Sequence, residues 1–375
     1  LKAQVYTSWC HNLLQLVLPA MRRTCSALCA AVLQASFFTA MAADVSNLHP
    51  SDIKVVLTLG DSITAAEAAE GKGWVQDTWL SFSGGQGEED QRTMPYLLNK
   101  LGGANAHGAS TGSQPQTTRF DYMLPDVENL NAAVSGSDSA DWEKQLDHLI
   151  QIYPKFVPNA SQESDWKLFT LFFGANDVCT HWDACYTTNG TLEEAQERVA
   201  DKFQWNMEQA LLKIIDTFHG NLYINLPALF DLGTVARIQE SEETCRWRLA
   251  VPLAFDYECF CIMSWTYPNG TAIDPLETGP SLSATVKKLN QRLELVAAKF
   301  DRYNGRNDIG VNFGEFMRDI TIPGIDFVSY GFDCFHPSAL AHDRLGVGLW
   351  NSMLEVSGPQ FNLSAPWFNQ PFKAT

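Results

Sequence analysis

Basic residues are scarce in this sequence. Of its 375 residues, 26 are lysine or arginine and 43 are aspartate or glutamate, so the formal net charge at pH 7 is −17. Proteins that bind nucleic acid carry a basic surface that neutralises phosphates, and basic clusters also attract anionic lipid. The scarcity therefore argues against a nucleic-acid partner and against electrostatic docking on an anionic membrane.

Repeats and metal-ligand clusters are also missing. The sequence has no internal repeat, heptad run or low-complexity block, which excludes a repeat array and a long coiled coil. Cys179, His181 and Cys185 lie close together, but nothing nearby repeats the Cys/His spacing that a zinc site of the finger type uses. We therefore expect no metal and no other cofactor.

The first 43 residues are typical of a leader. The segment Met21-Arg-Arg is followed by a charge-free run of apolar and small residues, and Ala40-Met-Ala42 offers an A-x-A cleavage pattern. This pattern predicts a secretory signal peptide at about residues 21–43, and a signal anchor that stays in the membrane is the alternative. Residues 1–20 precede that methionine, and we interpret them as an extension without a role in the fold.

Residues 44–375 are expected to form one domain of an exported glycoprotein. The leader holds three basic residues and no acidic one, so its removal changes the net charge from −17 to −20. An even number of cysteines behind a signal peptide indicates disulfides, although the sequence leaves their pairing open. The remaining cysteines are Cys179, Cys185, Cys245, Cys259, Cys261 and Cys334. Glycosylation sequons, which agree with a secreted, extracellular or lumenal location, start at Asn159, Asn189, Asn269 and Asn362.

Strand-like and helix-like stretches alternate along the chain. Apolar runs that indicate buried strands are Ile53–Leu59, Asn131–Gly136, Trp166–Phe173, Asn221–Leu226 and Ile309–Phe313. Helical spacing occurs at Thr93–Leu101, Trp142–Tyr153, Leu192–Phe218, Val286–Phe300 and Ala339–Leu354. This alternation predicts an α/β fold whose parallel sheet is covered on both faces and whose site lies beyond the carboxyl ends of the strands. The segment Thr234–Thr278 holds three cysteines and no clear period, so we expect a disulfide-tied excursion there.

Two serine motifs are candidates for chemistry. Ser62 follows the first predicted strand in Gly60-Asp-Ser-Ile63, and we expect a helix to start there, whose free N–H groups favour negative charge. The alternative is that Asp61 or Ser62 only caps this helix. Ser110 lies in Gly108-Ala-Ser-Thr-Gly112, a formal G-x-S-x-G. Its flanks are neither strand nor helix, as that motif requires, so we interpret Ser110 as a loop residue without a catalytic role.

Five residues together fit nucleophilic acyl transfer. A serine nucleophile needs a base, a group that orients the base, and donors for the oxyanion. Asp333 and His336 are three residues apart, which allows the carboxylate to reach Nδ1 while Nε2 faces Ser62. Asn176 offers a side-chain N–H and Gly136 an accessible backbone N–H, and both follow predicted strands. Taken singly, each of these residues can be explained as a cap, a turn or a surface residue.

Four blocks of this sequence resemble the SGNH, or GDSL-type, hydrolase superfamily and, more closely, its phospholipase B-like branch. The blocks are Gly60-Asp-Ser-Ile63, the Gly136 turn, Gly174-Ala-Asn-Asp177 and Asp333-Cys-Phe-His336. Further segments that resemble the branch are Asp52–Val56, Asp165–Phe173, Cys259-Phe-Cys261 and Leu349-Trp-Asn-Ser-Met353. The resemblance covers about residues 48–357. Ile63 replaces the usual leucine, a change that does not touch the chemistry.

The resemblance implies a fold and a site. The fold is a three-layer α/β/α sandwich, flavodoxin-like, with a central parallel sheet of about five strands in a single hydrolase domain. The site is a triad without metal in which Ser62 is the nucleophile, His336 the base and Asp333 the group that orients it. The Ser62 amide, Gly136 and Asn176 would form the oxyanion hole.

The implied function is that of a secreted serine ester hydrolase acting on fatty-acyl esters of phospholipids and lysophospholipids. An esterase for short-chain acyl groups or carbohydrate acetates is a second reading, because one such site serves many acyl substrates. A third is a lipid- or glycan-binding module without catalysis, which is disfavoured because every catalytic position is filled. We expect an acyl-ester substrate and infer no obligate protein partner; a lipid interface is an option that the sequence leaves open. Unlike repeated, membrane-anchored members of the branch, this chain has one unit and no terminal apolar span, so we expect a soluble product.

Overall fold

The computed structural model describes residues 44–115, 124–157, 165–235, 245, 259–263, 266–318 and 333–356. The contacts of the chain divide it between Ala43 and Asp44, and all described residues belong to the second unit. The expectations for the leader and for the sequons at Asn159 and Asn362 lie outside the described residues. Asn189 and Asn269 are both exposed.

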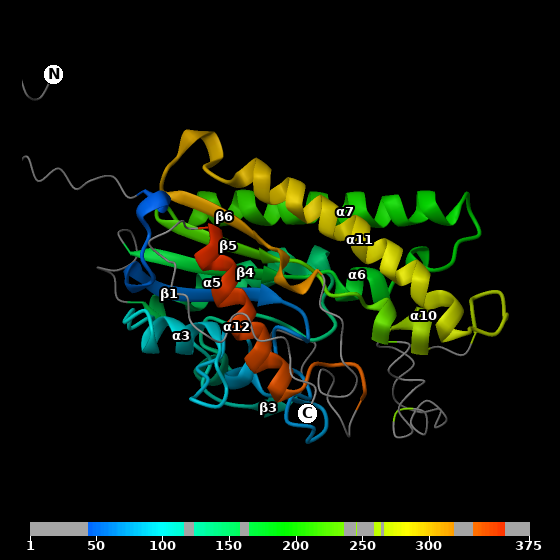
Figure 1. The fold of residues 1–375 in the computed structure, drawn as a ribbon, viewed down its shortest axis with the longest axis horizontal. Coiled ribbons are helices and arrows are strands. Elements are labelled where there is room, and N and C mark those ends of the chain that lie inside the picture. The colour runs from blue at the N-terminus through cyan, green and yellow to red at the C-terminus, as the bar shows by residue number, and fades with distance from the viewer. Residues whose placement is uncertain are drawn as a thin grey trace, which may run out of the picture. The chain divides into compact units, whose positions relative to one another are not determined.

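A parallel sheet with the order β1-β4-β5-β6 forms the centre of the described fold (Figure 1). Its strands are β1 (Ile53–Gly60), β4 (Trp166–Phe172), β5 (Leu222–Pro227) and β6 (Ile309–Gly314). Nearly every residue in them is buried, because the apolar runs that form the strands are covered on both faces. Four of the predicted strands and the α/β fold class are confirmed.

The fifth predicted strand, Asn131–Gly136, forms only in part. One parallel bridge joins Asn131 to Thr58, and the Val134 amide donates to the Gly60 carbonyl at 3.2 Å. The prediction of a strand that continues to Gly136 was wrong because a turn begins after Val134: the Ser137 amide donates to the Val134 carbonyl at 3.2 Å, and Gly136 has a φ of 79°. The segment nevertheless runs beside β1, on the side away from β4. If it is counted as the second strand of the chain, the strands lie in the spatial order 2-1-3-4-5, which is that of flavodoxin-like sheets.

Helices flank the sheet as predicted. They are α3 (Met94–Lys100), α5 (Trp142–Phe156), α7 (Leu192–Thr217), α11 (Pro275–Phe300) and α12 (Ala339–Val356). Helices α7 and α11 lie side by side, α5 contacts β1 and α7, and α12 contacts β6 and α3 (Figure 1). Helix α7 starts at a capping box of Thr191 and Glu194 and buries the predicted apolar face, including Phe203 and Met207.

The helix expected directly after Ser62 is absent. Residues 61–70 form successive turns instead. Ala66 and Ala68 have φ angles of 53° and 56°, a left-handed conformation that a right-handed helix cannot accommodate. Glu67, between them, forms an antiparallel bridge with Gln76. The prediction was wrong because this tertiary pairing outweighs the helix propensity of the alanines.

Short elements complete the described chain. A two-residue ribbon of β2 (Val75–Gln76) and β3 (Gln114–Pro115) was not predicted. The other short elements are η1 (Val45–Asn47), η2 (Pro50–Asp52), η3 (Thr78–Leu80), α4 (Pro125–Glu128), η5 (Ser139–Asp141), α6 (Ala175–Cys179), η7 (Trp182–Ala184), α10 (Phe260–Met263), η8 (Tyr303–Gly305) and η9 (Glu315–Met317). Among the described residues, no helix combines the length and apolar character needed to cross a bilayer.

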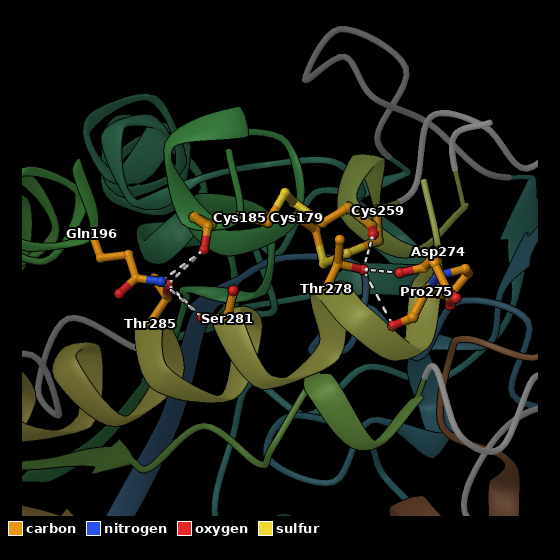
Figure 2. Close-up of a disulfide and its surroundings, with 11 residues drawn as sticks. Cys179, Cys185, Gln196, Cys259, Asp274, Pro275, Thr278, Ser281 and Thr285 are labelled. Carbon is orange, nitrogen blue, oxygen red and sulfur yellow. Dashed lines mark hydrogen bonds between the residues drawn. A yellow bond between two sulfur atoms is a disulfide. The ribbon is translucent and has the colours of Figure 1, made fainter. Parts of the chain in front are cut away.

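Three disulfides confirm that the cysteines are oxidised and fix the pairing that the sequence left open. They are Cys179–Cys259, Cys185–Cys261 and Cys245–Cys334. Each joins one cysteine of the excursion Thr234–Thr278 to a segment that follows a sheet strand or precedes α12. Figure 2 shows the first of them above the start of α11. The excursion is therefore disulfide-tied, as predicted.

Candidate active site

Ser62, His336 and Asp333 form a chain of hydrogen bonds. His336 Nε2 lies 2.7 Å from Ser62 Oγ, and His336 Nδ1 lies 2.8 Å from Asp333 Oδ2. The three residues are 6%, 3% and 2% exposed. A serine hydroxyl in contact with an imidazole whose other nitrogen meets a carboxylate is the arrangement that activates a serine nucleophile.

The turn before α12 explains why a spacing of three residues works. Asp333 Oδ1 accepts from the amides of Phe335 and His336 at 2.9 and 3.0 Å, which leaves Oδ2 for the imidazole. Cys334 has a φ of 58° and is covalently bound to Cys245. One carboxylate therefore shapes the turn and orients the histidine, while the disulfide anchors the turn to the excursion.

An ion pair fixes the first turns of α12 behind the histidine. Arg92 donates from Nε and Nη2 to the two oxygens of Asp343 at 2.9 and 2.6 Å, and its backbone amide adds a third bond at 2.7 Å. The hydrogen bond to Asp343 raises the pKa of Arg92. Bidentate pairs of this kind restrict geometry more than single contacts do. The pair holds α12 to the loop that precedes α3.

The end of β1 is clamped on both sides of Ser62. Gln145 of α5 accepts from the Gly60 amide at 2.8 Å and donates to the Gly60 carbonyl at 2.6 Å. A Cβ at Gly60 would lie 2.6 Å from the Phe172 carbonyl oxygen, so this position requires glycine. On the other side, Asp61 Oδ1 accepts from the Ile63 amide at 2.9 Å. Burial raises the pKa of Asp61 to about 7.

Gly136 and Asn176 come from the two neighbours of β1. The segment 131–136, which ends with Gly136, lies along one side of β1. Strand β4, which precedes Asn176, pairs with the other side, where Phe172 lies opposite Gly60. Gly136 has a φ of 79°. Asn176 Nδ2 donates to the Ser137 carbonyl at 2.9 Å, which brings the two segments together. Because Nδ2 carries two hydrogens, this bond uses one of them, and the group has a second that can donate.

A buried carboxylate joins the same two segments more firmly. Asp177 accepts from the Ser139 amide at 2.8 Å and from its hydroxyl at 2.5 Å, and Asn206 of α7 donates to that hydroxyl at 2.8 Å. Burial raises the pKa of Asp177 to about 6. The sequence does not predict this contact, because Ser139 lies 38 positions from Asp177, beyond any local pattern.

The unpredicted ribbon supports the Gly136 turn from the outside. Gln76 Nε2 donates to Ser135 Oγ at 2.7 Å, and Gln114 Nε2 donates to Gln76 Oε1 at 2.9 Å and also to Glu128. Burial raises the pKa of Glu128 to about 7. These contacts place a buried polar network directly before Gly136. These contacts could not be predicted from the sequence, because a strand of two residues is too short to show a repeating pattern of apolar residues.

Ser110, the other serine motif, has purely structural contacts. Its hydroxyl donates to the Thr78 and Gly84 carbonyls at 2.9 and 3.0 Å, and the residue is fully buried. The two cysteines of the possible metal cluster are in disulfides, and His181 Nε2 lies 3.3 Å from Asp138 Oδ2. Within the described ranges, no group of three His, Cys, Asp or Glu residues could hold a metal ion.

The family of the chain is shown by comparison with known proteins. A model described as GDSL-like lipase/acylhydrolase matches residues 56–347. The chain therefore belongs to this family, whose members are carboxylic ester hydrolases.

Individual relatives of the chain have low sequence identity to it. The chain is 30% identical over 331 residues to rat membrane-associated phospholipase B1 and 28% identical over 330 residues to the human protein. Each alignment covers 84% of this chain, which spans 20% of the relative's length. A crystal structure of an extracellular lipase from Streptomyces rimosus has a TM-score of 0.35 and 12% identity, covering 81% of this chain and all of the lipase.

Proposed function

We propose that the protein is a serine ester hydrolase that releases fatty acids from phospholipids and lysophospholipids, as a phospholipase B or lysophospholipase does. The observation that carries the proposal is the chain of hydrogen bonds from Ser62 through His336 to Asp333. It lies where α/β sheets of this topology bind ligands, beyond the carboxyl ends of the strands.

In the first half of the reaction, Ser62 Oγ attacks the carbonyl carbon of the acyl ester while His336 Nε2 takes the hydroxyl proton. The carbonyl oxygen becomes an oxyanion, which accepts hydrogen bonds from the amides of Ser62 and Gly136 and from Asn176 Nδ2. Each such donor contributes roughly 3–4 kcal/mol of transition-state stabilisation. The intermediate then expels the alcohol, which receives the proton from His336, and the acyl group stays on Ser62.

In the second half, a water molecule attacks the acyl-enzyme. His336 Nε2 takes a proton from the water and returns it to Ser62 Oγ as the fatty acid leaves. Asp333 accepts from Nδ1 throughout, which fixes the tautomer and stabilises the imidazolium between the two proton transfers. Every proton is moved by a residue of this chain, so the proposed reaction is complete without a cofactor.

The choice of substrate and location has separate support. The curated relatives are named phospholipase B1, which favours an acyl lipid over a carbohydrate acetate. Disulfides persist in oxidising compartments, and three of them surround this site. We therefore propose a secreted or lumenal enzyme.

The test is fatty-acid release from lysophosphatidylcholine and phosphatidylcholine micelles in EDTA, with wild type beside Ser62→Ala. We expect release by the wild type only, and the ratio of the two rates ranks the substrates. Cleavage of a soluble short-chain ester without release from either lipid would replace the proposal with a general or carbohydrate esterase. No turnover of any ester would leave only a binding module.

A further inference from the structure

Four partly exposed aromatic residues form a contiguous cluster near the site, here called the aromatic platform. Trp182 stacks on Phe260 with ring centroids 5.3 Å apart, and Tyr186 stacks on Tyr267 at 4.7 Å. Trp182 and Tyr267, 5.9 Å apart, join the two stacks. None of the four residues is fully buried. The reaction described above uses none of them.

The platform is rigidly held. Cys179–Cys259 and Cys185–Cys261 join the segment of Trp182 and Tyr186 to the segment of Phe260. Thr278 of α11 donates to the Cys261 carbonyl at 2.6 Å, beside its bonds to Asp274 and Pro275 (Figure 2).

Polar contacts also fix the other segment to two helices. Gln196 of α7 and Thr285 of α11 both donate to the Ala184 carbonyl, at 3.1 and 3.0 Å (Figure 2). Because both segments are anchored, the rings of Trp182, Tyr186 and Phe260 are presented at little cost in side-chain or backbone entropy, as effective aromatic recognition surfaces require.

The platform is continuous with the proposed oxyanion hole. Cys179 is the last residue of α6, the short helix that holds Asn176. His181, next to Trp182, contacts Asp138 at 3.3 Å, and Asp138 follows Ser137, the acceptor of the Asn176 amide. A surface that contacts the platform therefore lies close to the residues that would receive the acyl ester.

Carboxylates border the platform. Asp183 follows Trp182, and its side chain, 44% exposed, pairs with Arg198 Nη2 at 3.5 Å, so Asp274 and Glu277 carry most of the negative charge there. Asp274 and Glu277, both exposed, lie at the start of α11 near the Tyr267 ring. Burial raises the pKa of Tyr267, and the negative charges of Glu277 and Asp274 raise it further. Acidic groups around aromatic rings repel anionic lipid and attract cations, and aromatic faces bind quaternary ammonium groups.

We propose that the aromatic platform docks on a zwitterionic phospholipid surface, with rings and bordering carboxylates facing the trimethylammonium groups of choline lipids. This inference rests on the proposed function, since an enzyme for aggregated lipids must hold its site at the aggregate. Tryptophan and tyrosine are suited to this boundary because each combines an apolar ring with a polar group. The bordering carboxylates favour zwitterionic choline lipids over anionic lipids at this surface.

The test measures binding of the full chain to vesicles of phosphatidylcholine and of phosphatidylglycerol by sedimentation. We expect wild type to bind the phosphatidylcholine vesicles and the double variant Tyr186→Ala/Tyr267→Ala to bind about tenfold more weakly, because ring area is lost from the interface. Trp205→Ala is the matched control, since Trp205 is 60% exposed on α7 outside the platform, and should bind like wild type. Glu277→Lys should increase binding to phosphatidylglycerol.

Hydrolysis of a soluble short-chain ester separates this inference from the proposed function. We expect the double variant to retain the wild-type rate on that ester, which also shows that it folds, and to lose about tenfold on phosphatidylcholine micelles. Equal vesicle binding by the double variant and wild type, or no binding by wild type, would overturn the docking surface. Platform-dependent binding of an acetylated xylo-oligosaccharide without vesicle binding would reassign it to glycans. Failure of wild type on every ester would overturn the proposed function instead, and the vesicle result would still decide the platform.

Discussion

Ser62 and Ser110 are both buried serines in glycine-containing motifs, yet their surroundings differ completely. The Ser110 hydroxyl donates to two backbone carbonyls, of Thr78 and Gly84. The Ser62 hydroxyl contacts an imidazole nitrogen at 2.7 Å. A serine that donates to carbonyls cannot be deprotonated by them, whereas an imidazole can accept the proton. The partner of the hydroxyl, and not the spacing of the glycines, distinguishes the two motifs.

The largest expected effect comes from removing the hydroxyl that contacts the histidine. Ser62→Ala should lower kcat for ester hydrolysis by about 10⁵-fold or more, because the covalent route is lost. Thermal unfolding should change little, since a methyl side chain at this position leaves the turn intact. The measurement is steady-state hydrolysis of a soluble ester beside a melting curve. Activity close to that of wild type would show that another residue is the nucleophile.

The second prediction concerns the carboxylate of Asp333, which orients His336. The carbonyls around Ser110 have no such group in the described part of the chain. Asp333→Asn keeps an oxygen for the amides of Phe335 and His336 but no longer accepts from Nδ1 in the required tautomer. We expect kcat to fall by about 10⁴-fold. Asp343→Asn, which alters a carboxylate paired with Arg92 and not with the histidine, is the control and should cost far less. Equal losses in the two variants would indicate a structural role for Asp333.

The two serines also differ in their neighbouring carboxyl groups, because buried carboxyl groups lie near Ser62 and none contacts Ser110 among the described residues. Burial raises the pKa of Asp61 to about 7 and that of Asp177 to about 6, above the ordinary value of 3.8. Between about pH 4 and 7 these two carboxyl groups therefore bind more protons in the folded state than in the unfolded state, so their contribution to the free energy of unfolding should fall as pH rises through this window. We expect their joint contribution to change on the order of a few kcal/mol between about pH 5 and pH 8, and the lowered pKa of buried His342 acts in the opposite direction below about pH 6.5.

Denaturant unfolding at a series of pH values measures this change. Asp61→Asn keeps the acceptor for the Ile63 amide and removes the titration, so its stability should vary less with pH. Ser110→Ala is the control, because no carboxylate contacts Ser110 in the part of the chain that the structure describes, and its slope should equal that of wild type. Parallel slopes for wild type and Asp61→Asn would reject the assignment to Asp61.

The smallest effect on activity is expected at Ser110 itself. Ser110→Ala leaves the Thr78 carbonyl without this donor, which should cost about 1–2 kcal/mol of stability. The rate of ester hydrolysis should stay within about twofold of wild type at a temperature where the variant is folded. A loss comparable to that of Ser62→Ala would contradict the distinction between the two motifs.

Local patterns were sufficient for much of the fold. The apolar runs of β1 and β4 and the helical face of α7 gave bounds close to those observed, because buried parallel strands and amphipathic helices repeat at fixed periods. The same patterns failed at residues 63–70, where the left-handed Ala66 and Ala68 interrupt a helix-prone stretch. They also failed at the end of the segment 131–136, where a turn closed by the Ser137 amide and the Val134 carbonyl stops the pairing with β1. Both failures adjoin the candidate site: the pairing of Glu67 with Gln76 outweighs helix propensity in one case, and a local turn ends the strand in the other.

The sequence by itself determined which residues stand at strand ends and that Asp333 and His336 share one turn, because three residues of chain fix that distance. Only the tertiary structure decided that His336 meets Ser62, 274 positions away, because the sheet order places their segments at one edge. The disulfide pairing and the contacts of Asp177 were decided in the same way. A carboxylate or thiol carries no local record of a partner that packing brings to it from another part of the chain.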